Sequence, residues 1–269
     1  MEENPSVWSC PNCGQSLARD GATWRCASGH SFDVAREGYV NLIPGGHRPK
    51  NPGDTTPMLQ ARRRLLAAGH YAPLVQTLVS LVRQVPPGVI LDAGCGEGHY
   101  IGELAWAFPE SQCLATDVAK MAVSMTVRAH PKVACAVADT HHQLPVMDGS
   151  VDVIVNVFAP RNAAEFSRVL WPNGRLVVVL PDPGHLQELA AVLPLGIQPE
   201  KVTAVKTLLH DHFDVVTQTA VVVPLVLTRT SLADLITMTP NAFHRPGELA
   251  AAAPTDVTAR FQVLVFQKR

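Results

Sequence analysis

The feature that most constrains the fold is a regular alternation of short apolar runs and helical segments between residues 88 and 181. Five apolar runs have the length and composition of buried strands: VILDAG, QCLATD, VACAVAD, VDVIVNVFA and RLVVVLP. Helices are expected between them at residues 100–108, 119–129 and 163–170. Strands that alternate with helices form a parallel sheet with helices on both faces. The sequence therefore predicts an α/β fold with a doubly wound, Rossmann-like sheet.

The whole chain divides into three parts in this interpretation. Residues 1–35 form a small module, residues 36–84 are a linker followed by helices with a break at Gly69, and residues 85–269 form the main domain. Beyond residue 181 we expect helices at 185–193, 199–212 and 231–236, and strands at 215–228 and 261–267.

The composition is that of a folded protein. Hydrophobic residues make up 47% and charged residues 17% of the 269 positions, which excludes global disorder and allows a buried core. No apolar run reaches the roughly 18 residues that span a bilayer, and the start MEENPSVW does not resemble a signal peptide. We therefore expect a soluble, cytoplasmic protein with no membrane partner.

Three of the six cysteines crowd into the first 26 residues and belong to a metal-binding pattern. Cys10, Cys13, Cys26 and His30 have the spacing C-x2-C-x12-C-x3-H. Four such ligands without a carboxylate suit a closed, structural Zn2+ site, and no open coordination position suggests a catalytic role. The metal would supply folding free energy to a segment with little core of its own. The alternative is a set of unrelated cysteines with His30 as an ordinary surface residue.

A glycine-rich loop follows the first predicted strand of the main domain. Asp92 is followed by Gly94, Gly96 and Gly98, and glycines at these positions let the backbone turn tightly and approach a ligand. The spacing G-x-G-x-G differs from the G-x-G-x-x-G of dinucleotide folds, so a pyrophosphate is not expected. Asp92 would repel phosphate but attract the ammonium and sulfonium of S-adenosylmethionine. The motif continues into the last two candidate cofactor residues, His99 and Tyr100.

Two further acidic residues end predicted strands of the same sheet. Asp117 ends the second strand, where a carboxylate can accept hydrogen bonds from both ribose hydroxyls of a nucleoside. Asp139 follows the third strand, where its side chain could meet the adenine edge; turn capping explains Asp139 equally well.

Motifs along nearly the whole chain resemble one family, the RlmA-type 23S rRNA (guanine-N1-)-methyltransferases. These motifs are the zinc pattern, DVAREGYVNL, QARR with GHYAPL, DAGCGEGHY, NVFAPRN, HLQEL and MTP. The resemblance implies a class I S-adenosylmethionine-dependent methyltransferase that modifies a guanine in a hairpin loop of 23S rRNA near the macrolide site. It also implies a homodimer with zinc modules flanking an RNA-binding cleft. NVFAPRN is more similar to the branch that includes the tylosin-resistance methyltransferase than to the enterobacterial branch.

Methyl transfer to guanine N1 needs in-line positioning and an acceptor for the N1 proton. Asn156 ends the fourth strand and could hydrogen-bond the base edge, because an Asn in an apolar strand needs a partner. Phe158 could stack on an extruded base or pack in the core. His185 follows the fifth strand and is a candidate catalytic residue or a surface histidine. His141 and His142 are weaker candidates, and no residue stands out as the base.

Five arginines are candidate contacts to RNA phosphates: Arg36, Arg62, Arg63, Arg64 and Arg161. From residue 36 to residue 64 the chain has six Lys or Arg against two acidic residues, a difference of four. A basic stretch on a nearly neutral protein is typical of phosphate binding. A solvated loop and helix start explain it equally well.

Two other functions are compatible with parts of this pattern. A small-molecule methyltransferase has the same cofactor loop, but it needs neither a zinc module nor a basic linker. A catalytically silent RNA-binding protein needs no intact cofactor loop. The sequence therefore favours a methyltransferase of 23S rRNA that uses S-adenosylmethionine and a structural zinc ion.

Overall fold

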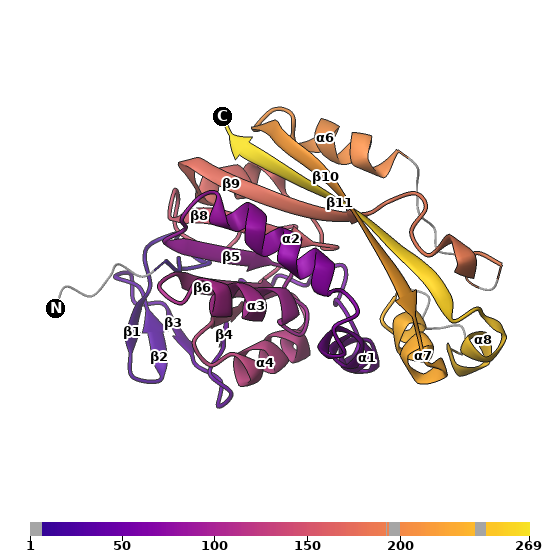
Figure 1. Ribbon diagram of the computed structural model, residues 1–269. Coiled ribbons are helices and arrows are strands. Elements are labelled where there is room, and N and C mark those ends of the chain that lie inside the picture. Colours follow the sequence, from indigo (N-terminus) through magenta and orange to yellow (C-terminus); the bar gives the residue numbers. More distant parts are fainter. Residues whose placement is uncertain (1–6, 192, 194–199, 240–245) are drawn as a thin grey trace.

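The computed structural model describes residues 7–191, 193, 200–239 and 246–269 (Figure 1). These residues contain an eight-stranded sheet that runs through the main domain. In spatial order its strands are β10 (Phe213–Val226), β11 (Asp256–Lys268), β9 (Leu170–Pro181), β8 (Val151–Val157), β5 (Val89–Ala93), β6 (Gln112–Asp117), β7 (Ala134–Val137) and β4 (Val40–Asn41). The strands from β4 to β9 are parallel, whereas β11 runs antiparallel to both β9 and β10. The predicted parallel sheet is thus confirmed, with a long antiparallel hairpin added at one edge.

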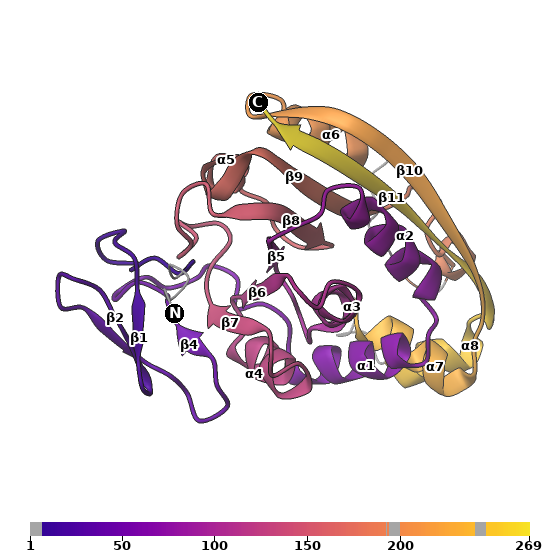
Figure 2. The ribbon, with the colours of Figure 1, turned by 60° about the vertical axis from the view of Figure 1, so that its left-hand side comes forward.

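Helices cover both faces of the sheet, as expected for a doubly wound fold (Figure 2). On one face lie α1 (Thr56–Ala67), α2 (Ala72–Arg83), α3 (His99–Ala107), α4 (Lys120–Ala129) and α7 (Arg229–Thr237), whose apolar side chains form one core. On the other face lie α5 (Ala163–Val169) and α6 (Lys201–Leu209), which pack into a second core around Phe166 and Leu209. β8 supplies both cores, because Val153 and Ile154 point to opposite faces.

The predicted break between the first two helices lies at Gly69, which has a φ of +79°. α1 and α2 meet there at an angle of 83°, and each has a proline in its first turn. Within the described ranges no helix is by itself long and apolar enough to cross a membrane, and only this bent pair passes by length and composition.

One predicted helix is wrong. Residues 185–193 were expected to be helical, but the structure has only the short 3-10 helix η1 (Gln187–Leu189) in the described part of that range. Leu186 has a φ of +54°, which no α-helix tolerates, and its amide donates to the Thr258 carbonyl oxygen in β11. Tertiary pairing therefore overrides local propensity. Pro199, where the next helix was expected to begin, and Pro240 of the MTP motif lie outside the described residues. The helix α8 (Pro246–Ala252) was not expected from the sequence.

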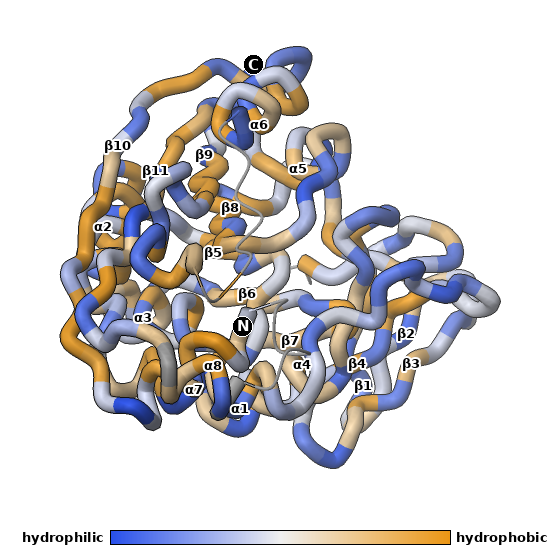
Figure 3. The backbone as a smooth tube through the Cα atoms, turned by 90° about the vertical axis from the view of Figure 1, so that its right-hand side faces the viewer, coloured by the Kyte–Doolittle hydropathy of each residue, from blue (hydrophilic) through white to orange (hydrophobic). Residues whose placement is uncertain are grey.

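The N-terminal module contains a three-stranded antiparallel sheet, β1 (Ala18–Asp20), β2 (Thr23–Arg25) and β3 (Ser31–Asp33). Its loops carry many hydrophilic residues, in contrast to the apolar central strands of the main domain (Figure 3). A β-bridge between Trp8 and Val146 joins the module to the loop before β8. β4, inside the expected linker, pairs with β7 of the main sheet. The linker is therefore partly built into the main domain.

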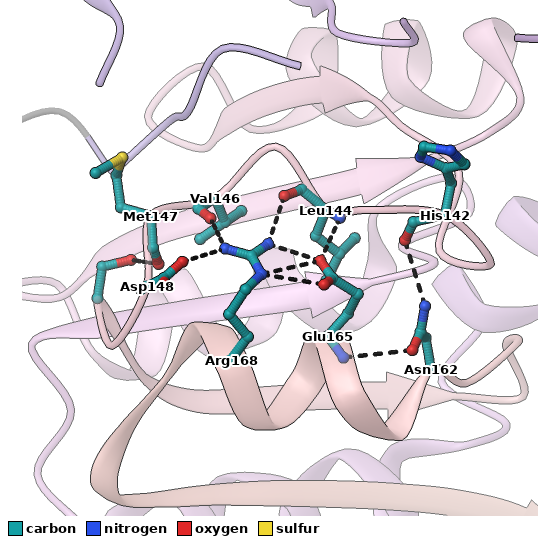
Figure 4. A network of polar contacts seen from close by, with 9 residues as sticks. His142, Leu144, Val146, Met147, Asp148, Asn162, Glu165 and Arg168 are labelled. Atoms are coloured by element: carbon teal, nitrogen blue, oxygen red, sulfur yellow. Dashed lines mark hydrogen bonds and ion pairs between the residues drawn. The ribbon is translucent and has the colours of Figure 1, made fainter. Parts of the chain in front are cut away.

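A hydrogen-bonded network fixes the loop that receives the module (Figure 4). Arg168 of α5 donates to the carbonyl oxygens of Leu144 and Val146, both at 2.8 Å. The same guanidinium pairs with Asp148 and Glu165, both at 2.6 Å. One helix side chain thus holds the loop segment 144–148 against α5.

Candidate functional site

The four predicted metal ligands converge in the N-terminal module. Their ligand atoms all lie within 4.8 Å of one another. The Sγ atoms of Cys13 and Cys26 are 3.7 Å apart, and His30 Nδ1 lies 3.5 Å from Cys10 Sγ and 3.4 Å from Cys26 Sγ. A tetrahedral Zn2+ with ordinary bond lengths sets S–S separations of about 3.8 Å and S–N separations of about 3.5 Å. The side chains are therefore spaced as zinc ligands, with His30 ligating through Nδ1.

The glycine loop leaves the carboxyl end of β5 in a conformation that only glycines adopt easily. Gly94 and Gly98 have φ values of +95° and +92°. A Cβ at Gly94 would collide with Ala159, and one at Gly98 would lie 2.7 Å from Thr126. The loop therefore packs tightly between β8 and α4, with its backbone close to the predicted cofactor.

Two acidic side chains in this loop are buried and have carboxyl oxygens without a hydrogen-bond partner among the described residues. Asp92 is 1% exposed, and neither of its carboxylate oxygens has a partner; Glu97, 4% exposed, has an unpaired Oε1. Burial and the nearby Asp117 and Glu97 carboxyls raise the pKa of Asp92 well above its usual value. Unpaired buried carboxyls are costly, and a cationic ligand would satisfy them. The ammonium and sulfonium of S-adenosylmethionine suit these acidic acceptors.

The predicted ribose and adenine residues occupy neighbouring strand ends. The Asp117 carboxylate accepts the Gly96 amide at 3.0 Å and the Ala119 amide at 2.8 Å, which fixes its orientation. Asp139 accepts a hydrogen bond from its own turn, as the alternative interpretation expected, and lies 2.9 Å from His47 Nε2. Burial tends to raise the pKa of Asp139, but the hydrogen bonds from His47 and the His141 amide lower it below its usual value.

The last two candidate cofactor residues face different surroundings. Tyr100 is buried, and burial together with nearby Tyr71 and Glu97 raises the pKa of its hydroxyl. Burial lowers the pKa of His99, whose titratable neighbours are Glu103 and His130 on the α4 side of α3. Tyr100 therefore borders the acidic loop, and the His99 ring packs edge-on against the Tyr100 ring, with 5.2 Å between centroids. The Tyr71 hydroxyl, also buried and without a partner, was not predicted.

The three consecutive arginines of α1 each have acceptors within the protein. Arg62 pairs with Asp54 at 2.5 Å and donates to the Met238 carbonyl oxygen at 3.1 Å. Arg63 donates to the Met125 carbonyl oxygen at 3.0 Å, and Arg64 pairs with Asp234 at 2.6 Å. Their guanidinium groups have protein acceptors, and contact of these arginines with RNA stays a prediction. Charge density along the sequence could not reveal these partners.

The carboxyl end of β8 carries Asn156 and Phe158. Asn156 is fully buried, and its Nδ2 donates to the carbonyl oxygens of Ala93 and Pro160 at 2.8 and 2.9 Å. It thereby ties the glycine loop to the segment after β8, while its buried Oδ1 has no hydrogen-bond partner in the described part of the chain. Phe158 is 45% exposed with a φ of +54°, so it is not a core residue. An exposed aromatic ring held in strained backbone suits a stacking role.

Phe158 and His185 contact the same buried ring, that of Phe261 in β11. The ring centroids lie 5.4 Å apart for Phe158 and 4.9 Å apart for His185, and Tyr71 packs at 4.9 Å. Burial lowers the pKa of His185 to about 4, so its imidazole is neutral at pH 7. Its Nδ1 lies 2.9 Å from the Arg260 carbonyl oxygen. The fold thus brings two predicted catalytic residues together through a residue that sequence reasoning missed.

Of the other two candidate arginines, Arg36 is exposed and Arg161 is largely buried. The Nε of Arg161 is buried and lacks a hydrogen-bond partner within the described residues. Burial lowers the pKa of Arg161 to about 10, and burial and Arg161 together lower the pKa of Lys201. Two neighbouring, partly desolvated cations favour an anionic ligand.

Comparison with known proteins matches both parts of this geometry. Residues 8–49 match a family model described as RlmA, N-terminal, a zinc ribbon, and residues 90–174 match a model described as methyltransferase domain. A "Putative 23S rRNA (guanine-N(1)-)-methyltransferase" of Micromonospora griseorubida is 42% identical, with 93% of each chain covered. The chain belongs to the 23S rRNA (guanine-N1-)-methyltransferase family. The 23S rRNA (guanine(748)-N(1))-methyltransferase of Streptomyces fradiae is 40% identical, covering 90% of this chain and 88% of its own.

Membership of the guanine-N1-methyltransferase family confirms the expected fold class, a class I methyltransferase with an N-terminal zinc module. It also confirms the expected cofactors, S-adenosylmethionine and structural zinc, for which the acidic glycine loop and the four converging ligands are suited.

Proposed function

We propose that this protein transfers a methyl group from S-adenosylmethionine to N1 of a guanine in a hairpin loop of 23S rRNA. The observation that carries the proposal is the end-to-end similarity to two 23S rRNA guanine-N1-methyltransferases, which includes the zinc ribbon as well as the cofactor domain. A small-molecule methyltransferase would need to share only the cofactor domain. The similarity to the guanine(748) enzyme favours the corresponding nucleotide.

The residues around the β8 end have distinct roles in this proposal. Bound S-adenosylmethionine would supply an electrophilic methyl group. Asp92 and Asp117 hold its cationic and ribose parts, and Asn156 keeps the loop after β8 in register with the cofactor loop. Phe158 stacks on the extruded guanine, because its ring is exposed and its backbone fixed. Neutral His185, whose Nδ1 contacts the Arg260 backbone, is the candidate acceptor of the N1 proton through Nε2.

RNA would contact both the zinc ribbon and the residues that follow the carboxyl end of β8. Arg161, with its partly desolvated guanidinium, is the candidate contact to a phosphate near the target base, and exposed Arg36 is a second one. Removing one cation that binds a phosphate should reduce the salt dependence of RNA binding by about one unit of slope. Arg161→Gln should therefore flatten the salt dependence, and an unchanged slope would exclude this interaction.

The function is tested by offering tritiated S-adenosylmethionine with naked 23S rRNA, assembled large subunits and a metabolite extract. We expect label in 23S rRNA, confined by mass mapping to N1 of one hairpin-loop guanine and abolished when that guanine is replaced by adenine. Label only in metabolites would establish a small-molecule methyltransferase. The absence of label from all three would favour an RNA-binding protein without activity.

We propose further that the active form is a homodimer, as the family resemblance implies. In support, the edge strand β10 has apolar side chains that are exposed to solvent in the single chain: Val215, Val216, Val222 and Val226. Light scattering on the purified protein should give twice the chain mass. A monomer at micromolar concentration would refute this part. We also propose that the protein acts in the cytoplasm, where 23S rRNA is available to it.

A further inference from the structure

We propose that Arg62 binds the α-carboxylate of the methionine part of S-adenosylmethionine. The inference rests on the proposed cofactor and names a residue for a group that the acidic loop cannot hold. The methionine part carries an ammonium and a carboxylate side by side. Asp92 and Glu97 suit the ammonium, but they repel the carboxylate, so a cation must face the same loop.

Arg62 is placed to be that cation. A Cβ built on Gly96 would lie 3.1 Å from Nη1 of Arg62, so the guanidinium lies directly against the glycine loop. The Arg62 side chain is only 24% exposed, although it comes from α1, before the methyltransferase domain in sequence. Gly96 has no side chain, so this residue places nothing between the guanidinium and the loop backbone.

The orientation of the guanidinium is already fixed by protein acceptors. Nη1 donates to Asp54 Oδ2 at 2.5 Å, and Nη2 donates to the Met238 carbonyl oxygen at 3.1 Å. A guanidinium has five N–H donors, so these two bonds leave donors for a carboxylate. Asp54 and the Met238 carbonyl therefore position Arg62.

The two following arginines provide internal comparisons. Arg63 donates to the carbonyl oxygens of Met125 in α4 at 3.0 Å and of Glu97 in the loop at 3.4 Å, so its guanidinium is bonded to backbone and does not contact Gly96. Arg64 forms an ion pair with Asp234 in α7 and is 59% exposed. Arg64 matches Arg62 in helix, residue type and carboxylate pairing, but its partner is in α7 and it has no contact with Gly96. Arg64→Gln is therefore the matched control for the loss of an ion pair on α1.

The test compares ligands that differ in the carboxylate, using calorimetric binding to the full-length, zinc-loaded protein. S-Adenosylhomocysteine and S-adenosylmethionine carry the group, whereas methylthioadenosine and decarboxylated S-adenosylmethionine lack it. We expect Arg62→Gln to weaken both carboxylate ligands roughly 10- to 100-fold, the range for a charge-assisted hydrogen bond. The affinities of this variant for the two ligands without the carboxylate should stay within about twofold of the wild-type values. Arg62→Lys should restore part of the loss, because it keeps the charge but not the planar fork.

Equal weakening of all four ligands by Arg62→Gln would overturn the proposal, because it would show a structural role. Unchanged binding of all four would overturn it as well. Arg64→Gln should leave every affinity within about twofold, and a loss selective for the carboxylate ligands in that variant would transfer the role to Arg64. If wild type binds S-adenosylhomocysteine but labels no 23S rRNA, the proposed substrate fails and the Arg62 site stands. If wild type does not bind S-adenosylhomocysteine, both fail.

Discussion

At the scale of single residues, Phe158 combines an exposed aromatic ring with a backbone conformation that costs free energy. Its φ of +54° lies in the left-handed region, where a non-glycine residue costs on the order of 1–3 kcal/mol. Its amide donates to the Val179 carbonyl oxygen at 3.2 Å, so the turn is held by the sheet. A residue that stability alone selected at this position would be glycine.

Replacing Phe158 with glycine should therefore separate stability from function. We expect Phe158→Gly to be at least as stable as Phe158→Ala in urea unfolding, because glycine relieves the strain. Both variants should lose roughly tenfold or more of rRNA methylation because the base no longer stacks, with S-adenosylhomocysteine affinity unchanged. Full methylation by Phe158→Gly would show that the ring does not contact the guanine.

The second prediction at this scale concerns the pH dependence contributed by His185. Burial lowers the pKa of His185 to about 4, whereas an unfolded histidine titrates near 6.5. Since the unfolded state takes up the proton first, stability falls as the pH drops from about 6.5 to about 4. Between pH 7 and pH 5, the protonation difference at His185 should lower the free energy of unfolding by about 2 kcal/mol.

The measurement is urea unfolding of His185→Phe and wild type at pH 7 and pH 5. Over this interval the free energy of unfolding of the variant should fall by about 2 kcal/mol less than that of wild type, since phenylalanine does not titrate. His210→Phe, at an exposed position on the surface, is the comparison variant. Identical pH dependence in His185→Phe and wild type would contradict the prediction.

At the scale of elements, one arginine joins α5 to the loop on which the zinc ribbon docks. Arg168 is 21% exposed and holds two carbonyl oxygens and two carboxylates, while Val7 and Ser9 bond to residues 147 and 145 of the same loop. The zinc ribbon is therefore positioned by a loop, and the loop is positioned by a side chain of α5.

Arg168→Met should destabilise the main domain by roughly 2–4 kcal/mol, because Glu165 loses its ion pair and the Val146 carbonyl oxygen loses the Arg168 hydrogen bond. Urea unfolding measures the loss, and hydrogen exchange should accelerate in residues 142–148. Arg128→Met is the control: Arg128 pairs with Glu37 but is 59% exposed, so its loss should cost under about 1 kcal/mol. Equal costs for the two variants would show that the Arg168 network does not hold the loop.

At the scale of the whole molecule, the zinc ribbon and the methyltransferase domain share one core. Trp8 and Leu17 of the ribbon pack in the same cluster as Leu144 and Phe166 of the domain. The proposed cofactor site lies on other elements, at the carboxyl ends of β5, β6 and β8. Substrate binding and cofactor binding should therefore respond differently to loss of the metal.

Removing zinc by chelation, or by Cys13→Ser, should unfold the ribbon, because structural zinc supplies its folding free energy. Hydrogen exchange should show loss of protection in residues 8–35, and metal analysis should give one zinc per native chain. Affinity for S-adenosylhomocysteine should stay within about twofold, while rRNA methylation falls roughly tenfold or more. Undiminished methylation by the zinc-free protein would exclude a role for the ribbon in substrate binding.

By itself, the sequence determined the features that depend on neighbours along the chain. The zinc ligands, the strands from VILDAG to RLVVVLP and the acidic glycine loop follow from spacing and periodicity over a few residues. Only the tertiary structure decided which side chains meet. Arg62 belongs to a basic run in the sequence, yet its acceptor Met238 is 176 residues away, and α1 packs it against Gly96. Phe261 looks like any core residue of a strand until β11 brings it between Phe158 and His185. The helix expected at 185–193 failed for the same reason, because Leu186 bonds to β11 across the fold. Contacts between distant segments carry no local periodic signal, so the roles they assign appear only once the chain is folded.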